Sequence, residues 1–270
     1  MINGDDGFTL VTRKPRATHK LRPLPLIRDS TNLPIDPEAP RDFVIKQVLS
    51  SKAEVESSHF FKGALCSLQQ SLDRSGQQKV EHLLCYGLGC FARCTAARHQ
   101  LGFLLALIAQ IGPCTCLLYD PLFSELEREL LTTEFGLSLI ETNEEGKRVI
   151  EGCTLVFAPH CPKQLTNNLL WANWQPERLA RCLLLANSFS AVAQNPACQP
   201  ETAQFLLRVL PLTSEVPLKN CFRLPDVFND LAFHSFETKK VRPEFWLELP
   251  APEYPENDTG KVICGNGRQS

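Results

Sequence analysis

Five short stretches of the chain are apolar at nearly every position, and each ends in glycine or in polar residues. Continuous apolarity is typical of a strand buried on both faces, whereas a half-exposed strand alternates. Between most of these runs, apolar residues recur three and four positions apart, as in amphipathic helices. The runs are residues 83–86, 114–119, 137–140, 153–158 and 183–186. This order predicts an α/β fold: a Rossmann-like, doubly wound, mostly parallel sheet with helices on both faces.

The helical spacing also predicts where the helices lie. Residues 42–72 carry it twice before the first strand, and a polar loop from Ser71 to Gln78 is expected to follow. Further helices are predicted after the first, second, fourth and fifth strands. They cover residues 96–111, 122–131, 165–174 and 201–210. Leu231 to Phe236 is predicted to form a last strand, at an edge of the sheet.

Composition divides the chain into four parts. They are a disordered, basic and proline-rich tail (1–40), a helical lead-in (41–75), the Rossmann-like domain (76–240) and an irregular C-terminal tail (241–270). The basic residues between Arg13 and Arg28 could contact an acidic partner or nucleic acid, although such a run is more often simply solvated.

Charge and hydropathy limit the function classes. The formal net charge of -2 gives no general field that would attract nucleic acid or an anionic membrane, so nucleic acid binding is expected only through the basic tail. No apolar run reaches the roughly 18 residues of a membrane span. The N-terminus lacks a signal-peptide pattern, which favours the cytoplasm and also allows the nucleus. The 12 cysteines include no Cys-x-x-Cys pair, so they are expected to be reduced thiols rather than zinc ligands.

The turn after the first strand is the first candidate site. Gly87, Gly89 and Ala92 fit Gly-x-Gly-x-x-Ala, in which small residues let the backbone approach a phosphate at a helix N-terminus. Glycine is also common in any strand-to-helix turn. Asp120, after the second strand, could hold a ribose diol, but it lies farther along the chain than the usual separation of about 20 residues.

The other strands also end in polar residues. His160, Cys161 and Lys163 follow the fourth strand, and Asn187 and Ser188 follow the fifth. Because ligands bind beyond the carboxyl ends of parallel strands, all of these are candidate ligand-binding residues. A histidine, a thiol and an ammonium could act as base, nucleophile and anion clamp, or His160 or Cys161 could be an axial ligand of haem iron. Alternatively, Pro162 starts the next helix and Cys161 packs beneath it.

Several blocks of sequence resemble the Sensitivity to Red Light Reduced family, in its animal SRR-like form. They are Cys85-Tyr86-Gly87-Leu88-Gly89, Tyr119-Asp120-Pro121, Glu144-Glu145-Gly146-Lys147, Pro159-His160-Cys161-Pro162-Lys163, Asn167-Asn168-Leu169-Leu170-Trp171 and Asn187-Ser188-Phe189. The resemblance spans about residues 80–192 and leaves out both tails. It implies a regulatory role in light and circadian clock signalling and, in animals and yeast, in haem biosynthesis. It implies no established catalytic activity.

Three functional hypotheses follow. The first is a regulatory protein that controls haem biosynthesis and circadian gene expression, with haem or an adenine-type nucleotide bound at the strand ends. The second is an enzyme that uses S-adenosylmethionine or a nicotinamide cofactor near His160, Lys163 or Asn187. The third is a ligand-free adaptor that binds protein partners. The sequence does not identify the partners.

Overall fold

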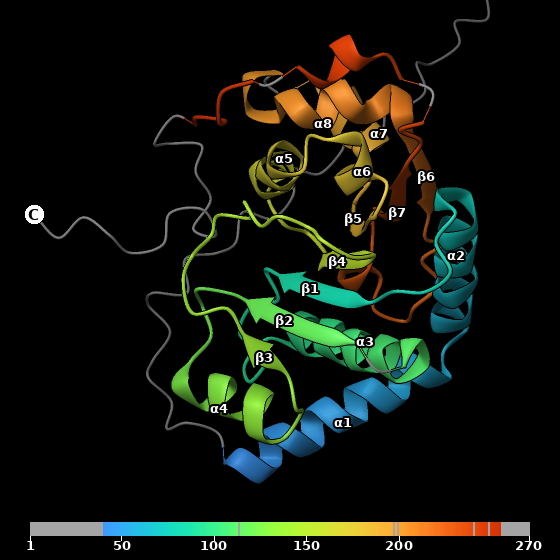
Figure 1. The fold of residues 1–270 in the computed structure, drawn as a ribbon. Coiled ribbons are helices and arrows are strands. Elements are labelled where there is room, and N and C mark those ends of the chain that lie inside the picture. Colours follow the sequence, from blue (N-terminus) through green and yellow to red (C-terminus); the bar gives the residue numbers. More distant parts are fainter. Residues whose placement is uncertain are drawn as a thin grey trace, which may run out of the picture. The chain divides into compact units, whose positions relative to one another are not determined.

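The computed structural model describes residues 40–254 except residues 113, 197, 199, 240 and 248. The basic N-terminal stretch and residues 255–270 lie outside the described residues. The described chain forms a central sheet with helices on both sides (Figure 1). The strands are β1 (His82–Tyr86), β2 (Thr115–Tyr119), β3 (Ser138–Leu139), β4 (Thr154–Ala158), β5 (Cys182–Asn187), β6 (Thr213–Pro217) and β7 (Leu231–Phe236).

The strand order is β3-β2-β1-β4-β5-β7-β6. Strands β3, β2, β1, β4 and β5 pair in parallel, and β7 is antiparallel to both β5 and β6. The predicted α/β, mostly parallel fold is therefore confirmed. The edge prediction was wrong, because β7 lies between β5 and β6. The edge strand is β6, which the apolar pattern missed because only Val216 of its five residues is buried.

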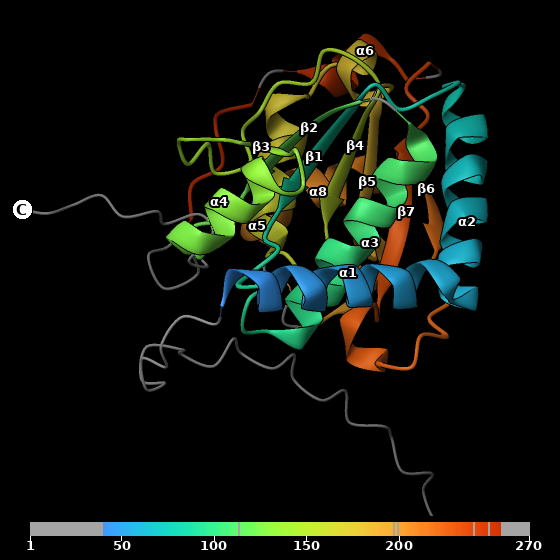
Figure 2. The same ribbon diagram turned by 90° about the horizontal axis from the view of Figure 1, so that it is seen from below.

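Helices cover both faces of the sheet. The α-helices are α1 (Arg41–Ser57), α2 (His59–Ser75), α3 (Thr95–Ile111), α4 (Glu125–Thr133), α5 (Lys163–Ala172), α6 (Pro176–Leu179), α7 (Phe189–Gln194) and α8 (Gln204–Val209). Short 3-10 turns are η2 (Pro200–Ala203), η3 (Leu210–Leu212), η4 (Pro225–Val227) and η5 (Pro243–Trp246). Figure 2 shows α1 running across α3, with α2 beside β6.

Two hydrophobic cores lie on the opposite faces of the sheet. Because successive strand residues point to opposite faces, β1 contributes Leu83 and Cys85 to one core and Leu84 and Tyr86 to the other. The first core also contains apolar residues of α1 to α4, and the second contains those of α5 to α8. Every strand residue of β4 is buried, which accounts for the continuous apolar run in its sequence.

The two helices predicted before the first strand are present as α1 and α2. Ser58 separates them, and its hydroxyl caps α2 by accepting a hydrogen bond from the Phe61 amide at 3.1 Å. The predicted loop began too early, because Ser71 to Ser75 continue α2. The helix ends at Gly76, which has a left-handed φ of 70°.

The turn after β1 departs from the expected geometry. Gly87 and Gly89 have positive φ angles of 68° and 78°, as a tight turn requires. The helix does not follow at once, however, because residues 91–93 form a separate turn and α3 begins only at Thr95. The amide of Ala92 therefore lies outside the first turn of α3.

Residues 140–153, which join β3 to β4, contain no helix. Side chains of neighbouring residues hold this loop in place. Asn168 donates to the Glu145 carbonyl at 2.8 Å, and Asn173 bonds the Ile150 amide at 2.7 Å and the Arg148 carbonyl at 2.8 Å. Side-chain amides therefore supply the hydrogen bonds that a crossover helix would make within itself.

Residues 242–254, called the strap below, follow the last strand and lie against α5 and α8. The sequence predicted an irregular tail here. Apart from the single turn of η5, the described residues of the strap have no regular structure, yet several of its side chains contact the two helices.

Candidate functional site

The carboxyl edge of the parallel strands collects most of the candidate residues. The chain leaves β1 toward β2 on one side and leaves β4 toward β5 on the other, so the strand order reverses between β1 and β4. This is the topological switch point at which doubly wound folds bind ligands. Gly87 and Gly89 follow β1 there, and His160 and Cys161 follow β4.

Asp120 lies directly against the glycine turn. Its Oδ2 atom accepts a hydrogen bond from the Gly89 amide at 2.6 Å, and its Oδ1 atom accepts one from the Leu122 amide at 2.7 Å. The side chain is buried, and burial raises the pKa of the carboxyl while the two amide bonds oppose the rise. The structure thus brings together the glycine turn and the acidic residue that the sequence singled out, despite their long separation.

A second carboxylate, Glu127, also binds this turn, and the sequence analysis missed it. Glu127 is 1 % exposed. Its Oε1 atom accepts a hydrogen bond from the Ala92 amide at 2.8 Å, while Oε2 accepts one from the Ser124 amide at 2.9 Å. Ser124 and Glu127 form a capping box at the start of α4, so the Ser-x-x-Glu spacing was the available signal.

Cys161 is buried under the glycine turn. Its thiol donates a hydrogen bond to the Tyr86 carbonyl at 3.3 Å and lies where a side chain on Gly87 would otherwise be. Burial raises the pKa of the Cys161 thiol far above its ordinary value, with a further contribution from Asp120. A protonated thiol enclosed in this way is neither an activated nucleophile nor a fitting axial ligand for haem iron.

His160 and Asn187 join the ends of β4 and β5. The Asn187 side chain accepts from the His160 amide at 3.0 Å and donates to the Cys161 carbonyl at 3.1 Å. His160 has a left-handed φ of 55°, and its Nε2 atom lies 3.1 Å from the Val227 carbonyl. Nε2 must therefore be the protonated nitrogen, and burial lowers the pKa of the ring. Lys163 begins α5 at the same edge and is half-buried.

Ser188 belongs to a separate network around Glu215. Its hydroxyl donates to Glu215 Oε1 at 2.5 Å and caps α7 by accepting from the Ala191 amide at 3.0 Å. Glu215 also accepts hydrogen bonds from the amide and the hydroxyl of Ser190, both at 3.0 Å. Ser188 is therefore a capping residue in this conformation.

His234, on β7, adjoins the same network. Its ring is completely buried and stacks on Phe189 with centroids 3.9 Å apart. Nδ1 lies 3.3 Å from the Leu184 carbonyl, and Nε2 lies 3.3 Å from the Phe189 amide. These partners require a neutral ring with its proton on Nδ1. Burial accordingly lowers the pKa of His234 to about 4, against an opposing effect of Glu215.

Arg98, near the start of α3, has structural partners. Arg98 donates to the Phe91 carbonyl at 3.0 Å, the Ala92 carbonyl at 3.2 Å and Gln47 Oε1 at 2.6 Å. Its guanidinium thus ties the turn after β1 to α1. Backbone carbonyls and an α1 side chain therefore occupy the Arg98 guanidinium in this structure.

Two features are absent from residues 40–254, less the five undescribed positions. No group of three or more His, Cys, Asp or Glu side chains is arranged to hold a metal ion. No helix in this range is long and apolar enough to cross a membrane. The cysteines in this range are free thiols, and Cys85, Cys116, Cys153, Cys161 and Cys182 are buried.

Comparisons with known proteins find related sequences. The SRR1 domain matches residues 65–235. An SRR1-like protein of Drosophila melanogaster is 31% identical over 243 residues, which cover 89% of this chain and 86% of that protein. An SRR1-like protein of Mus musculus is 33% identical over 59% of this chain and 76% of its own length. The Arabidopsis thaliana protein named Sensitivity to Red Light Reduced 1 is 27% identical over 77% of this chain and 80% of its own length.

Among solved structures the similarity is low. A crystal structure of MtNAS in complex with MTA and tNA has a TM-score of 0.38 at 13% identity, covering 73% of this chain and 74% of that chain. The mitomycin 7-O-methyltransferase MmcR has a TM-score of 0.32 at 13% identity, covering 74% and 69%.

Proposed function

Because this chain belongs to the SRR1 family, we propose that it is a regulatory protein that acts in the control of haem biosynthesis and of circadian clock gene expression. The name of the plant relative, which refers to red light sensitivity, supports a regulatory role. The family resemblance of the sequence supports the more specific assignment to haem synthesis and the clock.

The ligand that the carboxyl edge fits best is an adenine-type nucleoside, as in a nucleotide or S-adenosylmethionine. The observation that carries this proposal is the hydrogen bond between Asp120 and the Gly89 amide at the switch point between β1 and β4. A ribose diol offers two hydroxyl donors, and the two oxygens of Asp120 can accept both. On binding, Asp120 would accept hydrogen bonds from the ligand hydroxyls in place of the bond from the Gly89 amide. The Gly89 amide could then donate to the ligand.

Haem fits less well. A haem ligated by Cys161 would require the thiol to leave its site beneath Gly87 and to lose its proton, which burial opposes. Ligation through His160 Nε2 would require the loss of its bond to the Val227 carbonyl. We therefore place haem in the proposal as a product whose synthesis is regulated rather than as the bound ligand.

A ligand-free adaptor is the second candidate function. It is favoured by one observation: the polar side chains of Asp120, His160, Asn187 and Ser188 already have partners within the protein. Because these polar groups are hydrogen-bonded within the protein, the edge of the sheet is stable without a ligand. The same bonds weigh against the enzyme hypothesis, since none of these groups is poised to transfer a proton or to attack a substrate.

Thermal unfolding of the full chain tests the ligand proposal. S-adenosylmethionine, NAD, adenosine and haemin are added separately to the wild type, to Asp120→Asn and to Asp42→Asn, a control at an exposed position of α1. A ligand at about 100 times its Kd stabilises the folded state by roughly 2.7 kcal/mol, which raises Tm by several degrees. We expect an adenine compound to stabilise the wild type and Asp42→Asn but not Asp120→Asn. No shift with any adenine compound would favour the adaptor. A haemin Soret shift that His160→Ala or Cys161→Ala weakens would instead establish haem as the ligand.

Cells that lack the protein test the regulatory role. We expect altered transcript levels of haem-biosynthetic enzymes and an altered period of clock gene expression, both restored by the wild-type chain. Unchanged transcripts and period would contradict the regulatory assignment. If Asp120→Asn restores the transcripts and the period as completely as the wild type, regulation does not depend on ligand binding at the sheet edge.

A further inference from the structure

The strap is held against α5 and α8 by an aromatic cluster. Phe245 stacks on Trp174 with centroids 5.4 Å apart, and Trp246 lies 5.5 Å from the same ring. Phe205, on α8, packs edge-on against the other part of this cluster, with its ring centroid 5.0 Å from that of Trp174. Aromatic contacts of this kind commonly supply most of the binding energy where a flexible segment docks on a folded surface.

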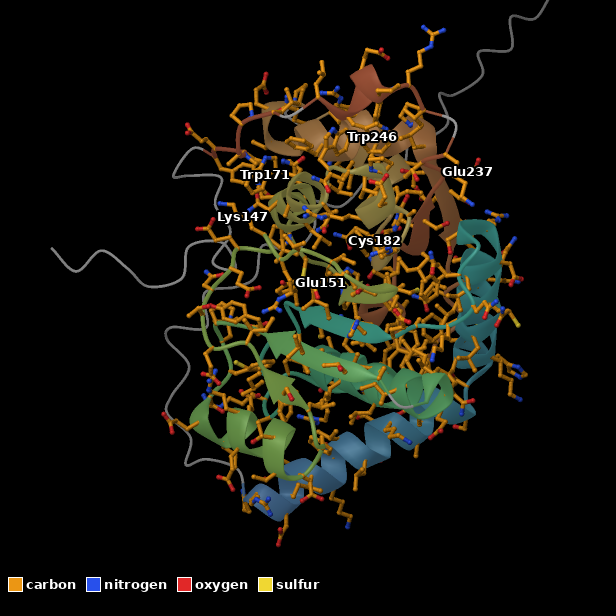
Figure 3. All side chains as sticks on the ribbon, in the orientation of Figure 1. Lys147, Glu151, Trp171, Cys182, Glu237 and Trp246 are labelled. Carbon is orange, nitrogen blue, oxygen red and sulfur yellow. The ribbon has the colours of Figure 1, made fainter. Side chains whose placement is uncertain are left out.

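Polar side chains of the core hold the strap along the rest of its length. Arg208 lies over the rings of Trp174 and Phe245 at 5.4 and 5.2 Å, and it donates to the Phe245 carbonyl at 2.6 Å. Farther along, the indole of Trp171 donates to the Leu249 carbonyl at 3.1 Å. Figure 3 shows Trp171 on α5 and Trp246 on the strap in the same upper part of the molecule.

Tyr254 is the last described anchor of the strap. Its hydroxyl accepts a hydrogen bond from Asn167 Nδ2 at 3.0 Å and donates to Asn168 Oδ1 at 2.8 Å. Both asparagines are completely buried on α5. Asn167 also accepts from the amides of Phe205 and Leu206 through its oxygen, so the anchor and the start of α8 share one side chain.

The strap contacts the core as a bound peptide would. Apart from bonds inside helices and strands, the backbone–backbone hydrogen bond of the described strap residues joins the Phe245 amide to the Arg242 carbonyl, within the strap itself. Side chains of α5, α8 and Trp174 contact strap carbonyls and rings, and no main-chain ladder joins the described strap residues to a strand. Recognition of linear peptides by domains uses this combination of side-chain anchors and an extended, proline-containing backbone.

We propose that the surface under the strap, formed by Trp171, Trp174, Phe205 and Arg208, is a recognition site for an aromatic, proline-containing linear peptide of a partner protein. The strap is its internal occupant. The chemistry of the occupant defines that of the partner: two adjacent aromatic residues (Phe245 and Trp246) followed by prolines at 250 and 252. This proposal goes beyond the function proposed above, because it involves neither Asp120 nor the carboxyl edge of the sheet.

One side chain that the strap contacts has an unpaired polar group. The indole N–H of Trp174 is buried and has no hydrogen-bond partner within the described part of the chain. A partner peptide that places a carbonyl or carboxylate oxygen there would satisfy a donor that the strap leaves unpaired. The tethered strap has the advantage of a high effective concentration, so a free peptide binds well only when the strap is released.

A labelled peptide tests the proposal on the full chain. Fluorescein-labelled peptide 242–254 is titrated with the wild type, with Phe245→Ala/Trp246→Ala, which releases the strap, and with Leu247→Ala, a matched control because Leu247 is 61% exposed. We expect anisotropy to show at least tenfold tighter binding to the double variant than to the other two. Adding Arg208→Gln should weaken that binding at least fivefold. A peptide with alanine in place of both aromatic residues should not bind.

Equal affinity of the peptide for the wild type and the double variant, or equal binding of the alanine peptide, would overturn the proposal. If the double variant does not fold, Tyr254→Phe serves instead. It should raise peptide affinity severalfold and red-shift the tryptophan fluorescence, because all three tryptophans of the chain lie in the strap or on the surface that it contacts. An unchanged affinity of Tyr254→Phe would also contradict the proposal. The wild type could instead form a dimer that the Phe245→Ala/Trp246→Ala substitutions abolish. That result would show that two copies exchange straps, and it would overturn the proposal of a partner peptide.

Discussion

Substitution of Gly87 by alanine should destabilise the protein more than substitution of Gly76, although the two glycines have the same backbone conformation. Their φ angles are +68° and +70°. At Gly76 an added Cβ meets nothing within 4 Å, whereas at Gly87 it overlaps Cys161 Sγ. Gly76→Ala therefore measures the cost of the left-handed conformation alone, and Gly87→Ala measures that cost together with the overlap.

The expected magnitudes follow from these two contributions. An L-residue in the left-handed region costs about 1–2 kcal/mol. Forcing an extra carbon into a packed site typically costs roughly 1–3 kcal/mol more, and the buried Cys161 has little room to move. We expect Gly76→Ala to lower the free energy of unfolding by about 1–2 kcal/mol and Gly87→Ala by roughly 2–5 kcal/mol.

Urea unfolding followed by far-ultraviolet circular dichroism measures both values. The double-mutant cycle of Gly87→Ala with Cys161→Ala isolates the overlap, since removal of the thiol makes room for the new methyl group. A favourable coupling energy of about 1–3 kcal/mol is expected. The packing explanation fails if Gly87→Ala and Gly76→Ala agree within about 0.5 kcal/mol, or if the cycle shows no coupling.

Three further predictions concern buried polar groups. The pKa of His234 falls from about 6.5 in the unfolded chain to about 4 in the fold, so its stabilising contribution is full above pH 6.5 and is lost as pH decreases toward 4. His234→Gln should flatten the stability profile in that window by up to about 3 kcal/mol, while His59→Gln, at an exposed position, should not. In urea unfolding, Asn173→Ala should lower the free energy of unfolding by about 2–4 kcal/mol, because it leaves two backbone groups of the β3–β4 loop without a hydrogen bond. The control Asn229→Ala, which removes an exposed hydrogen bond, should lower it by less than about 0.5 kcal/mol. Glu127→Gln should lower the free energy of unfolding by about 1–3 kcal/mol, because the NH2 group of glutamine would face one of the two backbone N–H donors. An unchanged urea midpoint would show that this carboxylate is not needed at the turn.

The sequence pattern predicted the inner strands well and the periphery less well. Strands β1, β4 and β5 are buried on both faces, so hydrophobicity alone identifies them. Strand β6 has one buried residue and is held by its pairing with β7, a long-range effect that no local pattern contains. The late start of α3 was also hidden, because the turn at residues 91–93 depends on Arg98 and on Glu127, which comes 35 residues after Ala92.

In the candidate site, too, local patterns predicted some features, and long-range contacts determine the others. The sequence located the strand ends correctly, since polar residues follow each buried run. It could not show that Asp120 faces the Gly89 amide or that Cys161 lies beneath Gly87, because both depend on how neighbouring strands align. No local pattern shows that Asn167 and Asn168 of α5 are completely buried, where they bind the strap and the β3–β4 loop.

The position of β7 has a consequence for synthesis on the ribosome. Strand β6 pairs with β7 alone, and β7 is the last strand of the described residues to be translated. While the nascent chain ends before residue 231, β5 is an open edge and β6 has no neighbour to join. Two of the seven strands must therefore join the sheet after most of the chain has been translated, and until then the β5 edge is open to pairing with another chain.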